Sequence, residues 1–123
     1  MTLTLEAALS RIIEADLPGF IDCRIDSVHS RGNLGDTPLH IAAFWGDTEM
    51  VCAFLDAGAD IDSKGEDDHT PLHYAIEAEK AEAARLLISR GANPRIKDWL
   101  GYDAIAACAE SSNEAIKALL HET

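Results

Sequence analysis

Residues 35–62 read GDTPLHIAAFWGDTEMVCAFLDAGADID, and this stretch decides the fold because much of it returns 33 residues later. Thr37-Pro38-Leu39-His40 recurs as Thr70-Pro71-Leu72-His73, and Gly58-Ala59 recurs as Gly91-Ala92. A shift of 33 gives eight identities in the 24 positions that begin at Thr37. A period of this length indicates stacked structural repeats, each too small to bury its apolar face alone.

Each repeat carries signals for two short helices. In the first repeat, Thr37 can cap a helix through its side-chain oxygen, and Pro38 suits the first helical position. Gly46-Asp47 predicts a turn, after which a second helix covers residues 48–57 with apolar residues at helical spacing. Gly58 supplies the left-handed residue that ends this helix. The second repeat follows the same plan.

This pattern resembles the ankyrin repeat in its Thr-Pro-Leu-His, its Gly-Ala-Asp and its 33-residue period. The resemblance is strong over residues 36–97 and weaker outside them. It implies an all-α solenoid of stacked helix-turn-helix units joined by short β-hairpin-like loops. Glu79 and Asp68 depart from the family pattern, because glycine is usual at both positions. Since Asp tolerates positive φ, we expect the turn at Asp68 to survive.

The ends are expected to be degenerate capping units of a single domain spanning 1–123, because terminal repeats are atypical. Thr4 lies 33 residues before Thr37 and begins an amphipathic pattern, and Asp103 stands where a repeat would have its threonine. The predicted division is an N-terminal cap unit (1–32), two repeats (33–65 and 66–98) and a C-terminal cap unit (99–123).

Two features of the caps are less determined by the sequence. Residues 17–28 have no clear pattern, and we expect a short second helix over Leu17–Arg24 with Phe20 and Ile21 inward. In the C-terminal cap, Ile116, Leu119 and Leu120 supply an apolar helix face if one turn residue is missing.

Composition limits the classes of function. The chain has 123 residues, is 47% hydrophobic, and carries a formal charge of −12 from 22 acidic and 10 basic residues. So acidic a chain is a poor binder of nucleic acid or anionic membranes, and no apolar run approaches the roughly 20 residues of a membrane span. Three separated cysteines and the lack of a secretion signal predict a cytoplasmic protein. Polar caps predict a monomer.

Catalytic and metal-binding motifs are hard to find. His69 and His73 have the i, i+4 spacing of a metal pair, but only His73 belongs to the predicted helix. The simpler interpretation is that His40 and His73 bond the loop backbone and join adjacent repeats. No phosphate-binding loop or nucleophile elbow is present. We therefore expect that the protein is not an enzyme and binds no metal or cofactor. An enzyme or a metal-binding protein remains a remote alternative.

The family resemblance implies that hairpin tips and the exposed ends of the first helices form a binding surface. These positions are Asn33, Leu34, Asp36, Phe44, Trp45, Glu66, Asp67, His69, Glu77, Ala78, Trp99, Leu100, Tyr102, Glu110 and Ser111. Both tryptophans of the chain fall in this set, and exposed aromatic residues are typical interface hot spots. The alternative is structural: Trp99 covers the hairpin tips and Phe44 joins the core between repeats.

An acidic centre between two tryptophans suits a basic protein partner, because complementary charge speeds association and fixes orientation. We therefore favour a small acidic inhibitor or immunity protein that neutralises a basic toxin or nuclease. The alternative within protein binding is a scaffold, or a regulatory or host-interaction adaptor with a different partner. The acidic run from Asp56 to Asp68 has a third explanation, which is solubility alone.

Overall fold

The computed structural model describes residues 3–20 and 24–119, and over these ranges the chain is helical and has no strand. The all-α prediction is therefore confirmed. The helices in these ranges are α1 (Leu5–Ala15), α2 (Pro38–Trp45), α3 (Thr48–Asp56), α4 (Pro71–Glu77), α5 (Ala81–Ser89), α6 (Ala104–Glu110) and α7 (Glu114–Ala118), with 3-10 turns η1 (Pro18–Phe20) and η2 (Glu66–Asp68). None of the described helices is long and apolar enough to cross a membrane.

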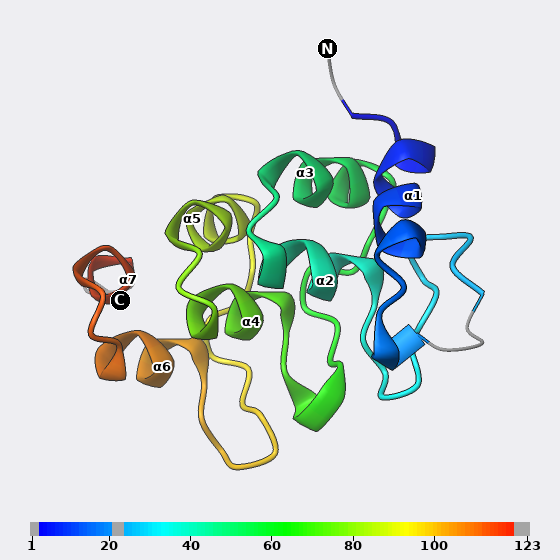
Figure 1. Cartoon of the computed structure of the whole chain (residues 1–123). Coiled ribbons are helices and arrows are strands. Elements are labelled where there is room, and N and C mark those ends of the chain that lie inside the picture. Colours follow the sequence, from blue (N-terminus) through cyan, green and yellow to red (C-terminus); the bar gives the residue numbers. More distant parts are fainter. Residues whose placement is uncertain (1–2, 21–23, 120–123) are drawn as a thin grey trace.

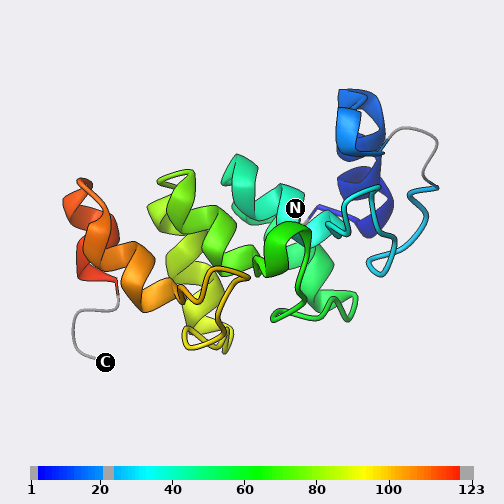
Figure 2. The ribbon, with the colours of Figure 1, turned by 90° about the horizontal axis from the view of Figure 1, so that it is seen from below.

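The helices form two layers. An inner layer runs from α2 through α4 to α6, and an outer layer runs from α1 through α3 and α5 to α7 (Figure 1). Each inner helix also packs against the outer helix that follows it in the chain. Seen from below, the units succeed one another along the stack, with the connecting loops toward the viewer (Figure 2).

Helix starts follow the 33-residue period through the whole repeat region. The inner helices have their N-caps at Thr37, Thr70 and Asp103, and the outer helices α3, α5 and α7 have theirs at residues 47, 80 and 113. Thr70 accepts a hydrogen bond from the His73 N–H, and Asp103 accepts one from the Ala106 N–H. Because α7 begins 33 residues after α5, no turn residue is missing before it, and that expectation is wrong.

The core lies between the two layers. Small residues on the inner helices allow close packing, and larger apolar residues of the outer helices fill the space behind them. Fully buried members include Leu39, Ala42, Met50, Phe54, Leu72, Ala75, Leu87, Ala104 and Ile116. Leu119 is partly buried against this core, whereas Leu120 lies outside the described residues.

The N-terminal unit differs from the expectation. The predicted amphipathic helix forms as α1, and Thr4 caps it by accepting from the Ala7 N–H at 3.1 Å. However, α1 packs mainly against the outer helix α3, and Arg11 reaches Asp47 at the start of α3. The second helix expected over 17–24 is reduced to the single turn η1, with Phe20 half-buried, and residues 21–23 lie outside the described ranges.

The loops between units close like hairpins without forming strands in the described ranges. The N–H groups of residues 32, 65 and 98 donate to the carbonyls of Asp36, His69 and Tyr102, each at 2.8 Å. Asp67 and Asp68 have φ of 55° and 62°, which confirms that Asp68 takes a turn position usual for glycine. Each loop is thereby held in a fixed shape beneath the inner layer.

Candidate protein-binding groove

Two buried histidines, His40 and His73, each attach one loop to the repeat that precedes it. His40 Nε2 lies 2.8 Å from the carbonyl of His69, and His73 Nε2 lies 3.1 Å from the carbonyl of Tyr102. On the other side of each ring, Nδ1 accepts the backbone N–H of Thr37 or Thr70. The interpretation of these histidines as ties between repeats is confirmed.

Both rings are held in the neutral form. Burial lowers the pKa of His40 and of His73, although hydrogen bonds to the loop carbonyls act in the opposite direction. A neutral ring with an accepting Nδ1 carries its proton on Nε2, which is the atom that faces each carbonyl. These histidines therefore position the loops and have no ring nitrogen left over for a metal.

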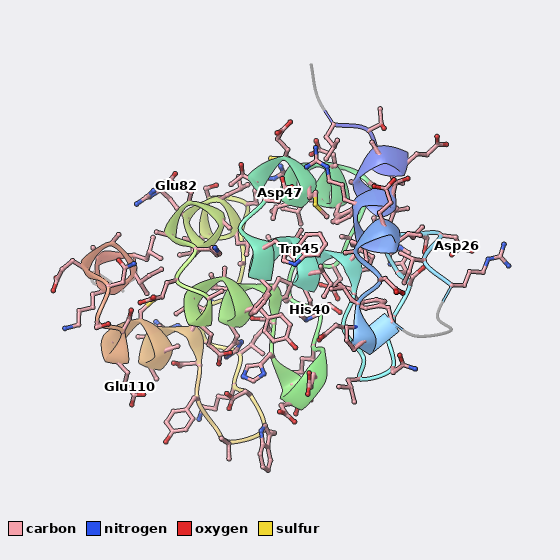
Figure 3. All side chains as sticks on the ribbon, in the orientation of Figure 1. Asp26, His40, Trp45, Asp47, Glu82 and Glu110 are labelled. Carbon is pink, nitrogen blue, oxygen red and sulfur yellow. The ribbon has the colours of Figure 1, made fainter. Side chains whose placement is uncertain are left out.

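Three adjoining hollows run along the inner layer and its loops, and together they form what we call the acidic groove. The first, about 290 Å³, lies between η1 and the end of α2 and includes Trp45. The second, about 380 Å³, lies between α2 and α4 beside Tyr74. The third, about 580 Å³, lies between α4 and α6 and includes Trp99. Figure 3 labels Trp45 at the end of α2, beside the first hollow, and Glu110 at the end of α6, beside the third.

Tyr74 forms the centre of the groove, although it is absent from the set predicted from the sequence. Its hydroxyl donates to Asp36, at 2.8 Å from Oδ1, and its ring packs against His40, Phe44 and His69. Burial, then this hydrogen bond, raises the pKa of Tyr74. Ile41, which lies 33 positions earlier and lines the same hollow, is absent from that set too, so the repeat register gave no signal for Tyr74.

His69 lies beside two carboxylates at the border of the second and third hollows. Its Nε2 is 3.1 Å from Glu77 Oε1 and 3.4 Å from Asp98 Oδ2, and its Nδ1 is 3.0 Å from the carbonyl of Glu66. All three partners are hydrogen-bond acceptors. In the described part of the chain, no group of three or more His, Cys, Asp or Glu side chains is arranged to hold a metal ion.

Asp98 is a buried carboxylate that holds the third loop. Its side chain is 7% exposed, and its Oδ1 accepts the N–H groups of Leu100 and Tyr102 at 2.9 and 3.0 Å. Desolvation alone would raise the pKa of Asp98, but these two hydrogen bonds and the neighbouring histidines outweigh it, so the pKa is lowered. Asp98 is absent from the set predicted from the sequence, because an isolated loop aspartate has no distinguishing signal.

Most of the predicted surface residues line the groove. They are Leu34, Asp36, Phe44, Trp45, Glu66, Asp67, His69, Glu77, Trp99, Leu100, Tyr102, Glu110 and Ser111. Asn33 and Ala78 do not line it: the Asn33 N–H donates to the Gly19 carbonyl at a loop, and Ala78 is the half-buried C-cap of α4.

The aromatic residues of the predicted surface differ in exposure. Trp99 and Tyr102 are 63% and 51% exposed, and Phe44 is also exposed, so Phe44 does not join the core between repeats as the structural alternative required. Trp45 is half-buried and packs against the core, which makes it partly structural. The backbone of Trp99 is hydrogen-bonded to the preceding loop, because its N–H donates to the carbonyl of Asp67 at 3.0 Å.

The charge of the groove has one sign. Among the described residues that line its three hollows there are carboxylates but no lysine or arginine. The carboxylates are Asp36, Glu66, Asp67, Glu77, Glu79, Asp98 and Glu110. Elsewhere in the described chain, acidic residues pair with arginines, as in Arg90–Asp56 at 2.8 Å and Arg24–Asp26 at 2.8 Å. A groove of this kind can attract and orient cationic groups.

Comparison with known proteins agrees with the fold. A family model described as ankyrin repeats (3 copies) matches residues 7–98 and 39–123. Rabankyrin-5 of Mus musculus is 35% identical over 88 residues, which is 70% of this chain and 8% of that protein. The human B-cell lymphoma 3 protein is 36% identical over 91 residues, which is 70% of this chain and 20% of that protein. Protein phosphatase 1 regulatory subunit 12A of Mus musculus is 44% identical over 76 residues, which is 62% of this chain and 7% of that protein. The chain thus spans a fifth or less of the length of these relatives.

Proposed function

The chain belongs to the ankyrin-repeat family, whose members are protein–protein interaction modules and generally not enzymes, and we propose that its acidic groove binds a basic partner protein. The observation that carries this proposal is the groove lining: seven carboxylates, no lysine or arginine among the described residues, and exposed aromatic side chains at the same surface. Aromatic anchors supply contact area, and the uniform charge selects a positive surface and speeds its approach.

The finer proposal is that the partner is a basic enzyme, such as a toxin or a nuclease, and that this chain is its inhibitor or immunity protein. Enzymes that act on nucleic acid need a positive active site, because their affinity arises from cationic side chains at phosphates. A rigid acidic groove can cover such a site as a competitor of the nucleic acid. In this proposal the protein works in the cytoplasm as a monomer.

The second candidate is a regulatory subunit or adaptor with a partner other than a toxin. It is favoured by the similarity to protein phosphatase 1 regulatory subunit 12A. The two candidates differ in what the bound partner does. An inhibitor abolishes the activity of one basic enzyme, whereas an adaptor leaves the activity of its partners in place.

The test combines capture of the native partner with matched variants. We expect Glu77→Lys and Trp99→Ala to weaken binding with little change in thermal midpoint, because both side chains are exposed. Glu14→Lys changes the net charge equally on the exposed surface of α1 and should leave binding intact. Equal loss in Glu77→Lys and Glu14→Lys would argue against the groove. Mass spectrometry of the captured material, followed by an assay of the partner with and without this chain, separates inhibitor from adaptor.

A further inference from the structure

The third hollow of the groove differs from the other two and is called here the α4–α6 cleft. It lies between α4 and α6 above the loop of residues 98–102 and has a volume of about 580 Å³. Apolar side chains of Ile76, Leu100 and Ala107 line it beside the aromatic rings of Trp99 and Tyr102. Three large apolar side chains in a row of four residues are exposed here, at 63% for Trp99, 61% for Leu100 and 51% for Tyr102. Exposed apolar surface of this kind marks an interaction site.

The carboxylates around the α4–α6 cleft are available to a ligand. Asp67, Glu79 and Glu110 line it, and none of their side chains has a hydrogen bond or an ion pair with any other described residue. Glu77 contacts His69 through Oε1, at 3.1 Å from Nε2.

Five of the six arginines of the chain, all except Arg95, contact groups outside the cleft. Arg11, Arg85 and Arg90 pair with acidic residues outside the groove, and Arg31 donates to the carbonyls of Gly35 and Lys64. The cleft therefore combines unpaired acceptors with exposed aromatic and apolar surface.

From this combination we propose that the α4–α6 cleft binds an arginine side chain of the partner, a proposal that rests on the proposed function and specifies its chemistry. A guanidinium group is flat, so it can stack on the rings of Trp99 and Tyr102 while its N–H groups donate to the carboxylates. Its three-carbon stem lies against the exposed Leu100. A lysine ammonium satisfies the charge but is more strongly hydrated and has no flat face for stacking.

The two tryptophans provide a direct test, because the chain has one indole N–H near each end of the groove. The protein labelled with ¹⁵N is titrated with N-acetyl-arginine amide at constant ionic strength, and Trp45→Phe assigns the two indole signals. N-acetyl-lysine amide and the uncharged N-acetyl-citrulline amide serve as matched ligands. We expect arginine to shift the Trp99 signal in a saturable way, lysine to bind more weakly and citrulline to have no effect, while the Trp45 signal stays in place.

Variants of the cleft locate the binding site. Glu110→Gln and Tyr102→Leu should each weaken arginine binding about two- to fivefold, which is the range for exposed ion pairs and cation–π contacts. Glu14→Gln on α1 should not change it. Circular dichroism and the thermal midpoint show whether each variant is folded.

Three results would overturn the proposal: no shift of Trp99 at tens of millimolar arginine, equal shifts with lysine, or equal shifts at Trp45 and Trp99. Its failure is distinguishable from failure of the proposed function. A partner that still needs Glu77 and the aromatic residues, but binds Glu110→Gln and the wild-type protein equally, leaves the groove in use and removes only the arginine assignment.

Discussion

At the scale of single residues, His40 and His73 link stability to pH. Each ring accepts a backbone N–H at Nδ1 and donates from Nε2 to a carbonyl of the next loop, so a second proton would place two donors against each other. The pKa of each lies below its ordinary value of 6.5 in the folded protein. Below pH 6.5 the unfolded chain therefore binds more protons than the folded one, and stability decreases as the pH falls.

We expect urea denaturation to give a lower free energy of unfolding at pH 5.5 than at pH 7.5, by up to about 1.4 kcal/mol per pH unit for each histidine. His73→Gln should reduce this slope by about half, although the variant is less stable at pH 7.5. His29→Gln, at an exposed position, should leave the slope unchanged. A slope that is the same in His73→Gln as in the wild type would contradict this account.

Glu79 is a residue at which the chain holds backbone strain. Its φ is 59°, close to the 73° of Gly46 at the matching position of the previous repeat. A left-handed conformation costs a residue with a side chain roughly 1–2 kcal/mol. Glycine avoids this cost, but it loses more conformational entropy on folding, which offsets part of the gain in stability. We expect Glu79→Gly to raise the free energy of unfolding by up to about 1 kcal/mol. Glu79→Ala removes the same charge but keeps the strain, so a thermal melt in which both variants gain equally would show that charge is responsible.

At the scale of elements, the outer helices are held mainly by their buried apolar residues. Leu87 is fully buried in the last turn of α5, and the same register position in α3 is Phe54, also fully buried. We expect Leu87→Ala to lower the free energy of unfolding by about 2–5 kcal/mol, as for other large-to-small changes in a core. The partly buried Leu86 beside it is the matched control, and Leu86→Ala should cost clearly less. Chemical denaturation measures the free energy of unfolding of the two variants. An equal decrease in both would show that Leu87 is not packed more tightly than Leu86, in contrast to the structure.

The helices of the repeats could be predicted from the sequence, whereas the contacts that occur only once in the structure could not. Thr70, Pro71 and Asp103 predict helix starts because capping and the fixed φ of proline act locally. The layer in which α1 lies is set by its packing on α3, and helical periodicity carries no information about it. In the groove, the register selected most lining residues, whereas Asp36 is held by the Tyr74 hydroxyl, a partner 38 residues away that no local pattern indicates.

At the scale of the whole molecule, the excess of acidic residues is unevenly compensated. Outside the groove, Arg11, Arg85 and Arg90 each pair with a carboxylate. Inside it, Asp67, Glu79 and Glu110 have no ion pair among the described residues. Part of the net charge of −12 is therefore concentrated on one surface, where like charges repel each other in the absence of a partner.

This distribution predicts how salt acts on stability. Raising NaCl from 20 to 500 mM shortens the screening length from about 20 Å to about 4 Å, so repulsion within the groove is largely removed and the thermal midpoint should rise. The double variant Glu79→Gln/Glu110→Gln should gain less from salt than the wild type, because the repulsion has already been reduced at its source. Glu6→Gln/Glu14→Gln on α1 removes the same charge away from the groove and should keep most of the salt effect. If the two double variants lose the salt effect equally, the repulsion is spread over the whole surface and the groove carries no special share of it.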